Sequence, residues 1–456
     1  MKVKIPHTLV LMFGLMAAAL VLTWIIPSGE FETVVNEQGQ EVIAPGSFTE
    51  TDKERLSPLA LLTVVPRALA EAQGIIFFVL IVGGALAVVR ETGAIDALLG
   101  KMVTAFGNYP AYLLFSFMFA FALASATLGM AEEYIPFAII LVSLCIALKI
   151  DSVTAIGTMV VGYGIGYGIA FLNPFTLLVA QDVAQLPLGS GMGYRLALGL
   201  PFLAVGFHHV WKYARSVRLD PTASLVYGSA ETHQAQPGEH PELTLRRKTV
   251  LAAFLAILIG LVVGIALADW YLVELGAMFL ALAIAAGLLS GLGADRTAIV
   301  FGNGAAELTS TALLIGFARS IALLLEDGVI LHTIINALST PLTYVGAEFA
   351  AVGMLFIQSI LNFFIPSGSG QAFVTMPLMA PIGDLAGVSR QISVLAFQFG
   401  DGLMNMVVPT NPVLMGILGL AGIPYNKWFR FIFPLLIKLM VLCSLALVLA
   451  VWIGYQ

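Results

Sequence analysis

The sequence predicts an all-α polytopic membrane protein whose two halves form an inverted structural repeat. Three observations predict this fold class: an apolar composition, a charge asymmetry between the polar loops, and short motifs that recur in the same order in both halves. Of the 456 residues, 59% are hydrophobic and 11% are charged, and the mean hydropathy is +0.97. So few charges cannot cover a soluble globule of this size, and the chain is therefore expected in a lipid bilayer.

Long uncharged runs supply the expected membrane-spanning helices. A helix needs about 20 apolar residues to cross the hydrocarbon core. Runs near or above this length occupy residues 8–26, 72–89, 102–131, 152–181 and 249–268. The first run follows Lys2 and Lys4 and lacks a convincing signal-peptide cleavage site, so we interpret it as a retained first helix.

The charge of the polar loops predicts the orientation. Residues 27–57 carry seven acids against Lys53 and Arg55, whereas residues 212–248 contain six basic residues. Because basic residues concentrate in cytoplasmic loops, we expect the N-terminus and residues 212–248 in the cytoplasm and residues 27–57 outside. Within the outer loop, "FETVV" and "EVIAP" flank "NEQGQ", which predicts a small β-hairpin.

Recurring motifs predict a repeat. Gly162, Gly164, Asn173 and Pro174 are followed 238 positions later by Gly400, Gly402, Asn411 and Pro412. Two expected spans, 249–268 and about 271–294, separate the cytoplasmic loop from the second repeat, which therefore begins inside, whereas the first begins outside. The predicted units are residues 1–57 (first helix and external loop), 58–211 (first repeat), 212–248 (cytoplasmic loop), 249–294 (linking helices) and 295–456 (second repeat).

Each half contains a segment typical of a re-entrant hairpin, at residues 126–149 and 363–384. Both contain a polar turn and an apolar arm too short for an easy crossing, so a helix-turn-helix that dips into the membrane is expected. In the second, "IPSGSGQAFVTMP" at 365–377 breaks an apolar run with serine and glycine. Glycine permits the turn and lets a ligand approach the backbone. The alternative is a glycine-rich connection at the membrane surface.

Each half also contains an interrupted helix, at "FLNP" (171–174) and "PTNP" (409–412). Proline removes a backbone hydrogen bond and disfavours helix at the residue before it, so Asn173 and Asn411 are expected outside helical geometry. Their side chains and the freed carbonyls are candidate ligands for sodium. The N–H groups of the following half-helix are candidates for an anionic ligand. The alternative is a plain proline kink.

The sequence gives little support to an enzyme or a nucleic-acid-binding protein. Walker A, HExxH and dinucleotide motifs are absent, and "GSG" at 368–370 lacks the G-x-S-x-G pattern of a serine hydrolase. We therefore expect no enzyme, no cofactor and no nucleic-acid partner, and retain a channel as the competing transport class. The glycines of "GYGIGYG" are expected to pack helices closely. Arg90, Glu91, Arg319 and Glu326 are expected to pair at helix ends or at the interface rather than to contact the substrate.

The chain resembles a known transporter family at residues 365–391, "IPSGSGQAFVTMPLMAPIGDLAGVSRQ", and 398–412, "QFGDGLMNMVVPTNP". These motifs are similar to those of the YfcC-type carriers, grouped with the C4-dicarboxylate anaerobic carriers and basic amino-acid antiporters of the ion transporter superfamily. The resemblance implies a bacterial inner-membrane homodimer with a scaffold domain and a mobile transport domain that works by elevator-type alternating access. It also implies a small-molecule substrate and contact with membrane lipid.

The expected substrate site combines the hairpins and the interrupted helices. Its candidate residues are Glu132, Glu133, Asn173, Ser367, Ser369, Gln371, Asp401, Asn405, Thr410 and Asn411, with a sodium site near Asn173 and Asn411. The superfamily's Ser-Asn-Thr motif is matched only in part by these residues, so coupling to sodium or to protons remains open.

Charge favours a cationic or zwitterionic amino acid, such as arginine or ornithine, as the substrate. Residues 152–194, 331–389 and 391–426 contain no lysine or arginine, so no fixed cation is expected in the site. Glu132 and Glu133 fall at the first hairpin's turn, where an intramembrane acid is a functional candidate. The alternatives are that both acids reach water and cap a helix, and that the substrate is a C4-dicarboxylate or other small carboxylate coupled to sodium or protons.

Overall fold

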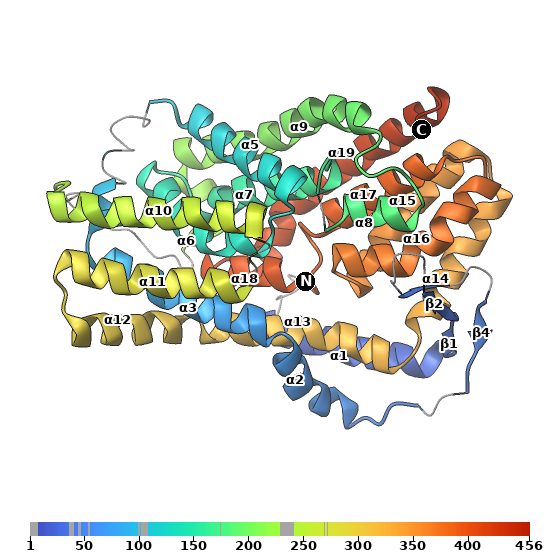
Figure 1. Ribbon diagram of the computed structural model, residues 1–456, viewed down its shortest axis with the longest axis horizontal. Coiled ribbons are helices and arrows are strands. Elements are labelled where there is room, and N and C mark those ends of the chain that lie inside the picture. The colour runs from blue at the N-terminus through green and yellow to red at the C-terminus, as the bar shows by residue number, and fades with distance from the viewer. Residues whose placement is uncertain are drawn as a thin grey trace.

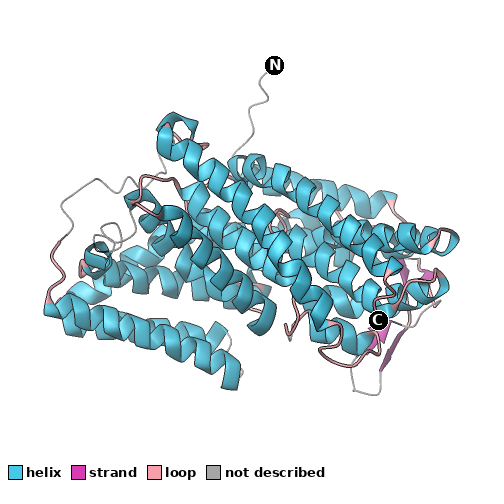
Figure 2. Ribbon diagram, turned by 90° about the horizontal axis from the view of Figure 1, so that it is seen from above, coloured by secondary structure: helices cyan, strands magenta, loops and turns pink. Residues whose placement is uncertain are grey.

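The computed structural model describes residues 8–35, 41–43, 47–52, 55–98, 101, 108–173, 175–228, 241–268, 270 and 272–456. It is mostly helical, and the short strands gather at one end of the molecule (Figures 1 and 2). The first half contains α1 (Thr8–Ile25), α2 (Ala60–Glu71), α3 (Gln73–Glu91), α5 (Pro110–Leu128), η1 (Glu132–Tyr134), α6 (Ile135–Ala147), α7 (Ser152–Gly168), α8 (Leu177–Val183), α9 (Met192–Leu219) and η2 (Pro221–Ala223).

The second half follows two linking helices. These are α10 (Leu245–Ala268) and α11 (Leu272–Ser290). The remaining elements are α12 (Ala294–Glu307), α13 (Thr309–Asp327), α14 (Leu331–Ser339), η3 (Thr340–Tyr344), α15 (Ala347–Phe364), α16 (Gly368–Leu385), α17 (Arg390–Met404), α18 (Pro412–Leu420) and α19 (Tyr425–Trp452).

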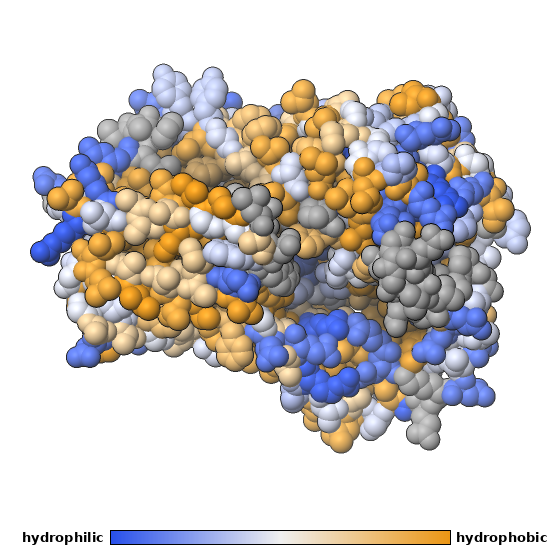
Figure 3. Space-filling model, viewed as in Figure 1, coloured by the Kyte–Doolittle hydropathy of each residue, from blue (hydrophilic) through white to orange (hydrophobic). Residues whose placement is uncertain are grey.

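Two of the expected apolar runs, 72–89 and 102–131, contain helices that could span a membrane, α3 and α5. Within the described residues, α3, α5, α11, α15 and α19 are long and apolar enough to cross a membrane, and a bent pair formed by α13 and α14 would be a sixth. Apolar side chains cover the face formed by α10, α11 and α12 (Figures 1 and 3). Such a continuous apolar surface is typical of a protein surrounded by lipid. The run 152–181 is interrupted between α7 and α8, as predicted.

The helices form two groups. In the first, α3 packs on α11 and α12, and α13 packs on α1 and α2. The second group combines α5 to α9 with α15 to α19, and its centre is the contact between α7 and α17. The two groups meet where α13 packs on α18 and α3 packs on α6 (Figure 1).

Helices α9 and α19 correspond residue by residue, a match that the recurring sequence motifs did not reveal. Each has 28 residues and contains a proline at its tenth position, Pro201 in α9 and Pro434 in α19. Each also follows a short helix, α8 or α18. Residues at equal steps along α9 and α19 can therefore be compared directly.

The predicted β-hairpin is confirmed by strand pairing, and its position outside the membrane stays a prediction. Strands β2 (Thr33–Val35) and β3 (Glu41–Ile43) are antiparallel, with Thr33 opposite Ile43. Residues 36–40, where the turn was expected, lie outside the described residues. Strands β1 (Gly29–Glu30) and β4 (Thr49–Glu50) form a second antiparallel pair. Because β3 packs against α16 and β1 against α14, this segment covers one end of the second half.

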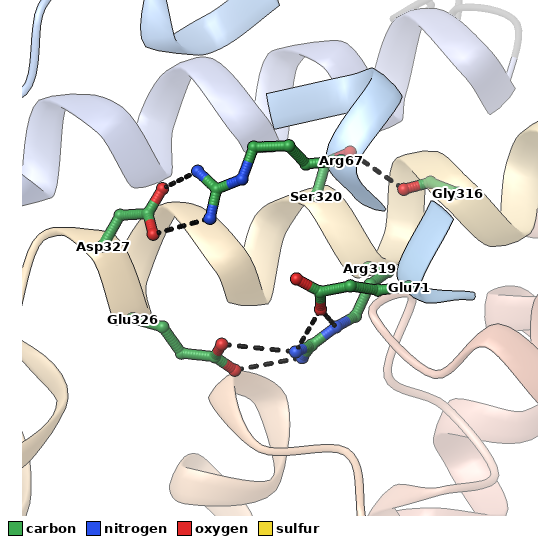
Figure 4. A network of polar contacts seen from close by, with 7 residues as sticks. All are labelled: Arg67, Glu71, Gly316, Arg319, Ser320, Glu326 and Asp327. Carbon is green, nitrogen blue, oxygen red and sulfur yellow. Dashed lines mark hydrogen bonds and ion pairs between the residues drawn. The ribbon is translucent and has the colours of Figure 1, made fainter. Parts of the chain in front are cut away.

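Ion pairs at the helix surface confirm most of the expected pairings. Arg319 of α13 contacts Glu71 of α2 at 2.8 Å and Glu326 at 3.0 Å (Figure 4). Glu91 pairs with Arg296 at 2.6 Å, whereas Arg90 has no ion pair among the described residues. These pairs tie α2 to α13 and α3 to α12, and their exposure limits each to roughly 0–1 kcal/mol.

Candidate functional site

The two interrupted helices cross at glycines. A Cβ atom on Gly402 of α17 would overlap the backbone of Gly168 of α7, and a Cβ atom on Gly164 would overlap the side chain of Met406. Tyr163 adds a hydrogen bond across the crossing, from its hydroxyl to the carbonyl of Asn405 at 3.2 Å. The expected role of these glycines in close helix packing is confirmed.

The second hairpin has a much shorter break than the serine and glycine composition suggested. Helix α15 ends at Phe364 and α16 begins at Gly368, so only residues 365–367 separate them. The Ser367 hydroxyl caps α16 by accepting a hydrogen bond from the Gly370 N–H at 3.4 Å. The first turn of α16, rather than a loop, therefore carries Ser369 and Gln371.

A chain of amide and carboxyl groups joins the second hairpin to α17. Asn362 donates from Nδ2 to Gln371 Oε1 at 3.2 Å and to Asp401 Oδ1 at 2.9 Å. Asn405 also donates to Asp401 Oδ1, at 3.1 Å, and accepts from Asn411 Nδ2 at 2.7 Å. At the other end, Gln371 Nε2 donates to Gln358 Oε1 at 2.7 Å. The structure thus brings Gln371, Asp401, Asn405 and Asn411 together.

Three buried oxygen atoms in this region have no hydrogen-bond partner within the described part of the chain: Asn362 Oδ1, Gln398 Oε1 and Asp401 Oδ2. We call them the acceptor cluster. Gln398 and Asp401 are three residues apart on α17 and so share a face. Asp401 Oδ2 lies 3.1 Å from the position that a Cβ atom on Gly368 would take. Buried acceptors left unpaired are costly, so this cluster calls for a ligand that donates hydrogen bonds or carries positive charge.

The asparagines of the two Asn-Pro motifs each bind the backbone that follows them. Asn411 caps α18, whereas Asn173 holds the turn before α8, whose N-cap is Thr176. Asn411 is extended, with φ −76° and ψ 112°, and its Oδ1 accepts from the N–H groups of Val413 and Leu414 at 2.9 and 3.1 Å. Asn173 Oδ1 accepts from the N–H groups of Phe175 and Thr176 at 2.9 and 3.1 Å. Both residues lie outside helical geometry as expected; Pro174 lies outside the described residues. Each amide oxygen already accepts two hydrogen bonds, so these contacts give no support to the expected sodium ligation or to free N–H groups for an anion.

The remaining predicted residues lie apart from the amide chain. Thr410 donates from Oγ1 to the carbonyl of Phe363 at 2.7 Å. Glu133 is buried in η1, where its Oε2 accepts from the Ala131 N–H at 2.7 Å. Glu132 begins the same turn, and its side chain lies outside the description. Ser369 is half-buried, and the side-chain hydrogen bonds that Asp401 accepts within the described residues come from Asn362 and Asn405.

A cation from outside the interrupted helices lies beside the first of them. Arg195, one residue beyond the lysine- and arginine-free stretch, is fully buried. It donates from Nη1 to the carbonyl of Ala170, just past the end of α7, at 3.3 Å, while its Nε and Nη2 have no described partner. A positive charge there complements the negative end of the α7 dipole.

Several residues of the site were missed by sequence reasoning. Gln358 and Asn362 are polar residues four positions apart in the apolar α15, a spacing that places them on one helix face. That spacing was a usable signal, since polar residues inside apolar spans are functional candidates. Gln398, three residues before Asp401 on α17, carried the same signal, whereas Thr176 did not. They meet through the Gln398 Nε2 to Thr176 Oγ1 hydrogen bond at 3.2 Å, which joins the two halves.

One relative of the chain is named as a transporter. A protein of Escherichia coli named "Putative basic amino acid antiporter YfcC" is 32% identical, and the match covers 99% of this chain and 97% of that protein. A Haemophilus influenzae protein is 26% identical, covering 98% of this chain and 97% of its own length. The chain is thus a membrane transporter and not an enzyme.

Solved structures show a weaker likeness. The YdaH transporter of Alcanivorax borkumensis matches with a TM-score of 0.44 and 16% identity, over 99% of both chains. MtrF of Neisseria gonorrhoeae, from a class of antimetabolite efflux pumps, matches with a TM-score of 0.42 and 17% identity, over 98% of this chain and 95% of its own. The family is shown by the sequence: residues 5–452 match the C4-dicarboxylate anaerobic carrier family, and the chain therefore belongs to that family.

Proposed function

We propose that the protein is a secondary antiporter of basic amino acids, such as arginine and ornithine. The observation that carries this proposal is Asp401. Its side chain is fully buried, its Oδ2 has no described partner, and no lysine or arginine pairs with it among the described residues. A guanidinium or ammonium group would supply the missing donor and the missing charge.

The acceptor cluster suits a guanidinium in particular. Asp401 Oδ2, Asn362 Oδ1 and Gln398 Oε1 can each accept from the several N–H groups that a guanidinium presents in one plane. The name of the E. coli relative, a basic amino acid antiporter, supports the same substrate class.

The proposed mechanism uses the two helix groups. We assign α1 to α3 and α10 to α14 to a dimeric scaffold, and α5 to α9 with α15 to α19 to a mobile domain that carries the substrate by an elevator motion. In this proposal the halves have inverted topology, the N-terminus is cytoplasmic and the membrane is the bacterial inner membrane. Coupling to sodium or protons, and a contribution of Glu132 or Glu133 to the site, remain predictions.

A C4-dicarboxylate is the second candidate substrate. The family description favours it, and so does the buried guanidinium of Arg195, which has two nitrogens without a described partner. Asp401 argues against a dicarboxylate. Two substrate carboxylates next to a third carboxyl group in a poorly solvated site would leave negative charge uncompensated, which is unfavourable.

Counterflow in proteoliposomes separates these candidates. Vesicles loaded with arginine, ornithine, lysine, succinate or fumarate are diluted into trace labelled substrate, with sodium and proton gradients varied separately. The proposal expects accumulation driven by basic amino acids alone. Accumulation driven by succinate or fumarate in preference to every amino acid would replace it with the dicarboxylate function, and linear flux without exchange or saturation would indicate a channel.

A further inference from the structure

A long groove of about 740 Å³ runs between α15 and α19 on the surface of the molecule. Its walls are formed by Phe356, Ile360 and Phe363 of α15, Met404 of α17, and Ile437 and Val441 of α19. Both α15 and α19 are long and apolar enough to cross a membrane, so the groove faces the space that lipid occupies.

The polar groups of the groove are already satisfied. Ser359 donates from its hydroxyl to the carbonyl of Leu355 at 2.8 Å, and Ser444 donates to the carbonyl of Met440 at 2.9 Å. These serines therefore have no need of a polar ligand. The walls fit a flexible hydrocarbon chain, because a polar ligand would lose its hydration there without gaining hydrogen bonds.

At the corresponding positions of α9, the first half has larger aromatic side chains. The sixteenth and twentieth residues of α9 are Phe207 and Trp211, whereas those of α19 are Met440 and Ser444. Phe207 packs edge-on against Phe115 of α5, with ring centroids 5.1 Å apart, and stacks with Trp211 at 6.5 Å. Aromatic rings thus fill the space in one half that smaller or more flexible side chains leave open in the other.

A cation stands above the groove on the same face of α19. Arg430, Phe433, Ile437 and Val441 follow one another at steps of three, four and four residues, which places them on one stripe. Helix α19 has 28 residues, about 42 Å at 1.5 Å per residue, and so exceeds the roughly 30 Å hydrocarbon core. We place its first turns in the headgroup region because they carry Lys427 and Arg430. Arg430 is exposed and forms no ion pair among the described residues.

We propose that the groove between α15 and α19 holds an acyl chain of one anionic phospholipid, whose phosphate pairs with Arg430. The chain seals the groove against Phe363 and Met404, which border the second hairpin and the end of α17. Because Thr410 is hydrogen-bonded to the Phe363 carbonyl, the lipid supports the backbone next to the Asn411 cap. This site does not depend on which substrate is carried.

Native mass spectrometry of protein purified from membranes of phosphatidylglycerol and phosphatidylethanolamine tests the proposal. The parent should retain one phosphatidylglycerol per chain. Ser444→Trp, which copies Trp211 of the first half, should lose that lipid, and so should the milder Met440→Phe. Leu449→Trp is the matched control, since Leu449 is exposed on α19 but does not line the groove; it should retain the lipid as the parent does.

The headgroup contact is tested separately. Arg430→Gln should lower the preference for phosphatidylglycerol over phosphatidylethanolamine by about fivefold, the effect of one basic residue near an anionic lipid. The neighbouring Lys427→Gln should leave the preference unchanged. Equal lipid retention by Ser444→Trp, Met440→Phe and the parent would overturn the proposal. It would also be overturned if these variants changed the oligomeric state without changing the lipid count, because the groove would then be a contact between two copies.

Discussion

The two interrupted helices share a backbone design and differ in charge. In each, an asparagine side chain accepts two backbone N–H groups of the residues that follow it. In each, the fourth residue of the next long helix donates to a carbonyl just past the end of α7 or α17. That donor is Arg195, to Ala170, in the first half and Trp428, to Met406 at 2.9 Å, in the second. The two helices also differ within their own length. Helix α17 has the carboxyl group of Asp401, whereas the corresponding residue of α7, 238 positions earlier, is Tyr163.

This difference indicates which half is incomplete without a ligand. The first interruption has its own cation, placed at the negative end of α7. The second has a neutral indole at the corresponding position, a buried carboxyl group and an unpartnered Oδ2. We infer that the substrate supplies at the second interruption the positive charge that Arg195 supplies at the first.

The largest effect is expected from Asp401→Asn, measured as the rate of arginine counterflow. Removing one partner of a buried, hydrogen-bonded charge pair costs about 2–5 kcal/mol, so kcat/KM for a basic amino acid should fall about 30-fold or more. Tyr163→Phe is the matched variant at the corresponding position of α7, and it should change kcat/KM less than about tenfold. Equal losses in the two variants would mean that the charge of Asp401 has no special role.

A smaller effect is expected at the crossing of the two interrupted helices. Gly402→Ala would place a Cβ atom against the backbone of Gly168, which has no side chain that can move aside, and overpacking of this kind costs about 1–3 kcal/mol or more. Thermal unfolding in detergent should show a lower melting temperature. In Gly302→Ala of α12, where nothing lies within 4 Å of the added atom, the melting temperature should be unchanged or higher. A harmless Gly402→Ala would contradict the close contact.

The smallest effect compares the two asparagines. Asn411→Ala removes the cap of α18, which costs about 1 kcal/mol of folding free energy, and Asn173→Ala removes the two backbone hydrogen bonds that Asn173 accepts in the turn before α8. Only Asn411 also bonds Asn405 and so reaches Asp401. Asn411→Ala should therefore raise KM for the substrate, whereas Asn173→Ala should lower the melting temperature with little change in KM. The reverse pattern would place the substrate at the first interruption.

Much of the fold was predictable because its signals are local. Apolar runs, the Asn-Pro dipeptides and the hairpin-forming residues each act within a few positions of the chain, and the structure breaks α7 and α17 next to Asn173 and Asn411 as expected. The shortness of the second hairpin's break was less predictable. Gly368 and Gly370 suggested a loop, yet Ser367 caps a helix that starts immediately after it.

The composition of the site was only partly predictable because it depends on contacts between distant segments. Asp401 and Asn405 were recognisable as polar residues on an interrupted helix, but their connection to Gln371 runs through Asn362 of another helix. Arg195 reaches the first interruption from α9, 25 residues along the chain from its partner Ala170. Only the packing of α9 on α7 brings them together.

Equilibrium binding of arginine and citrulline to the purified protein tests the central claim most directly. The two ligands have nearly the same shape and differ in the positive charge of the side chain. If the second interruption recognises that charge, the parent should bind arginine at least about tenfold more tightly than citrulline, a difference of about 1.4 kcal/mol, and Asp401→Asn should bind both about equally. A parent without preference, or an Asp401→Asn variant that keeps the parent's preference, would contradict the account.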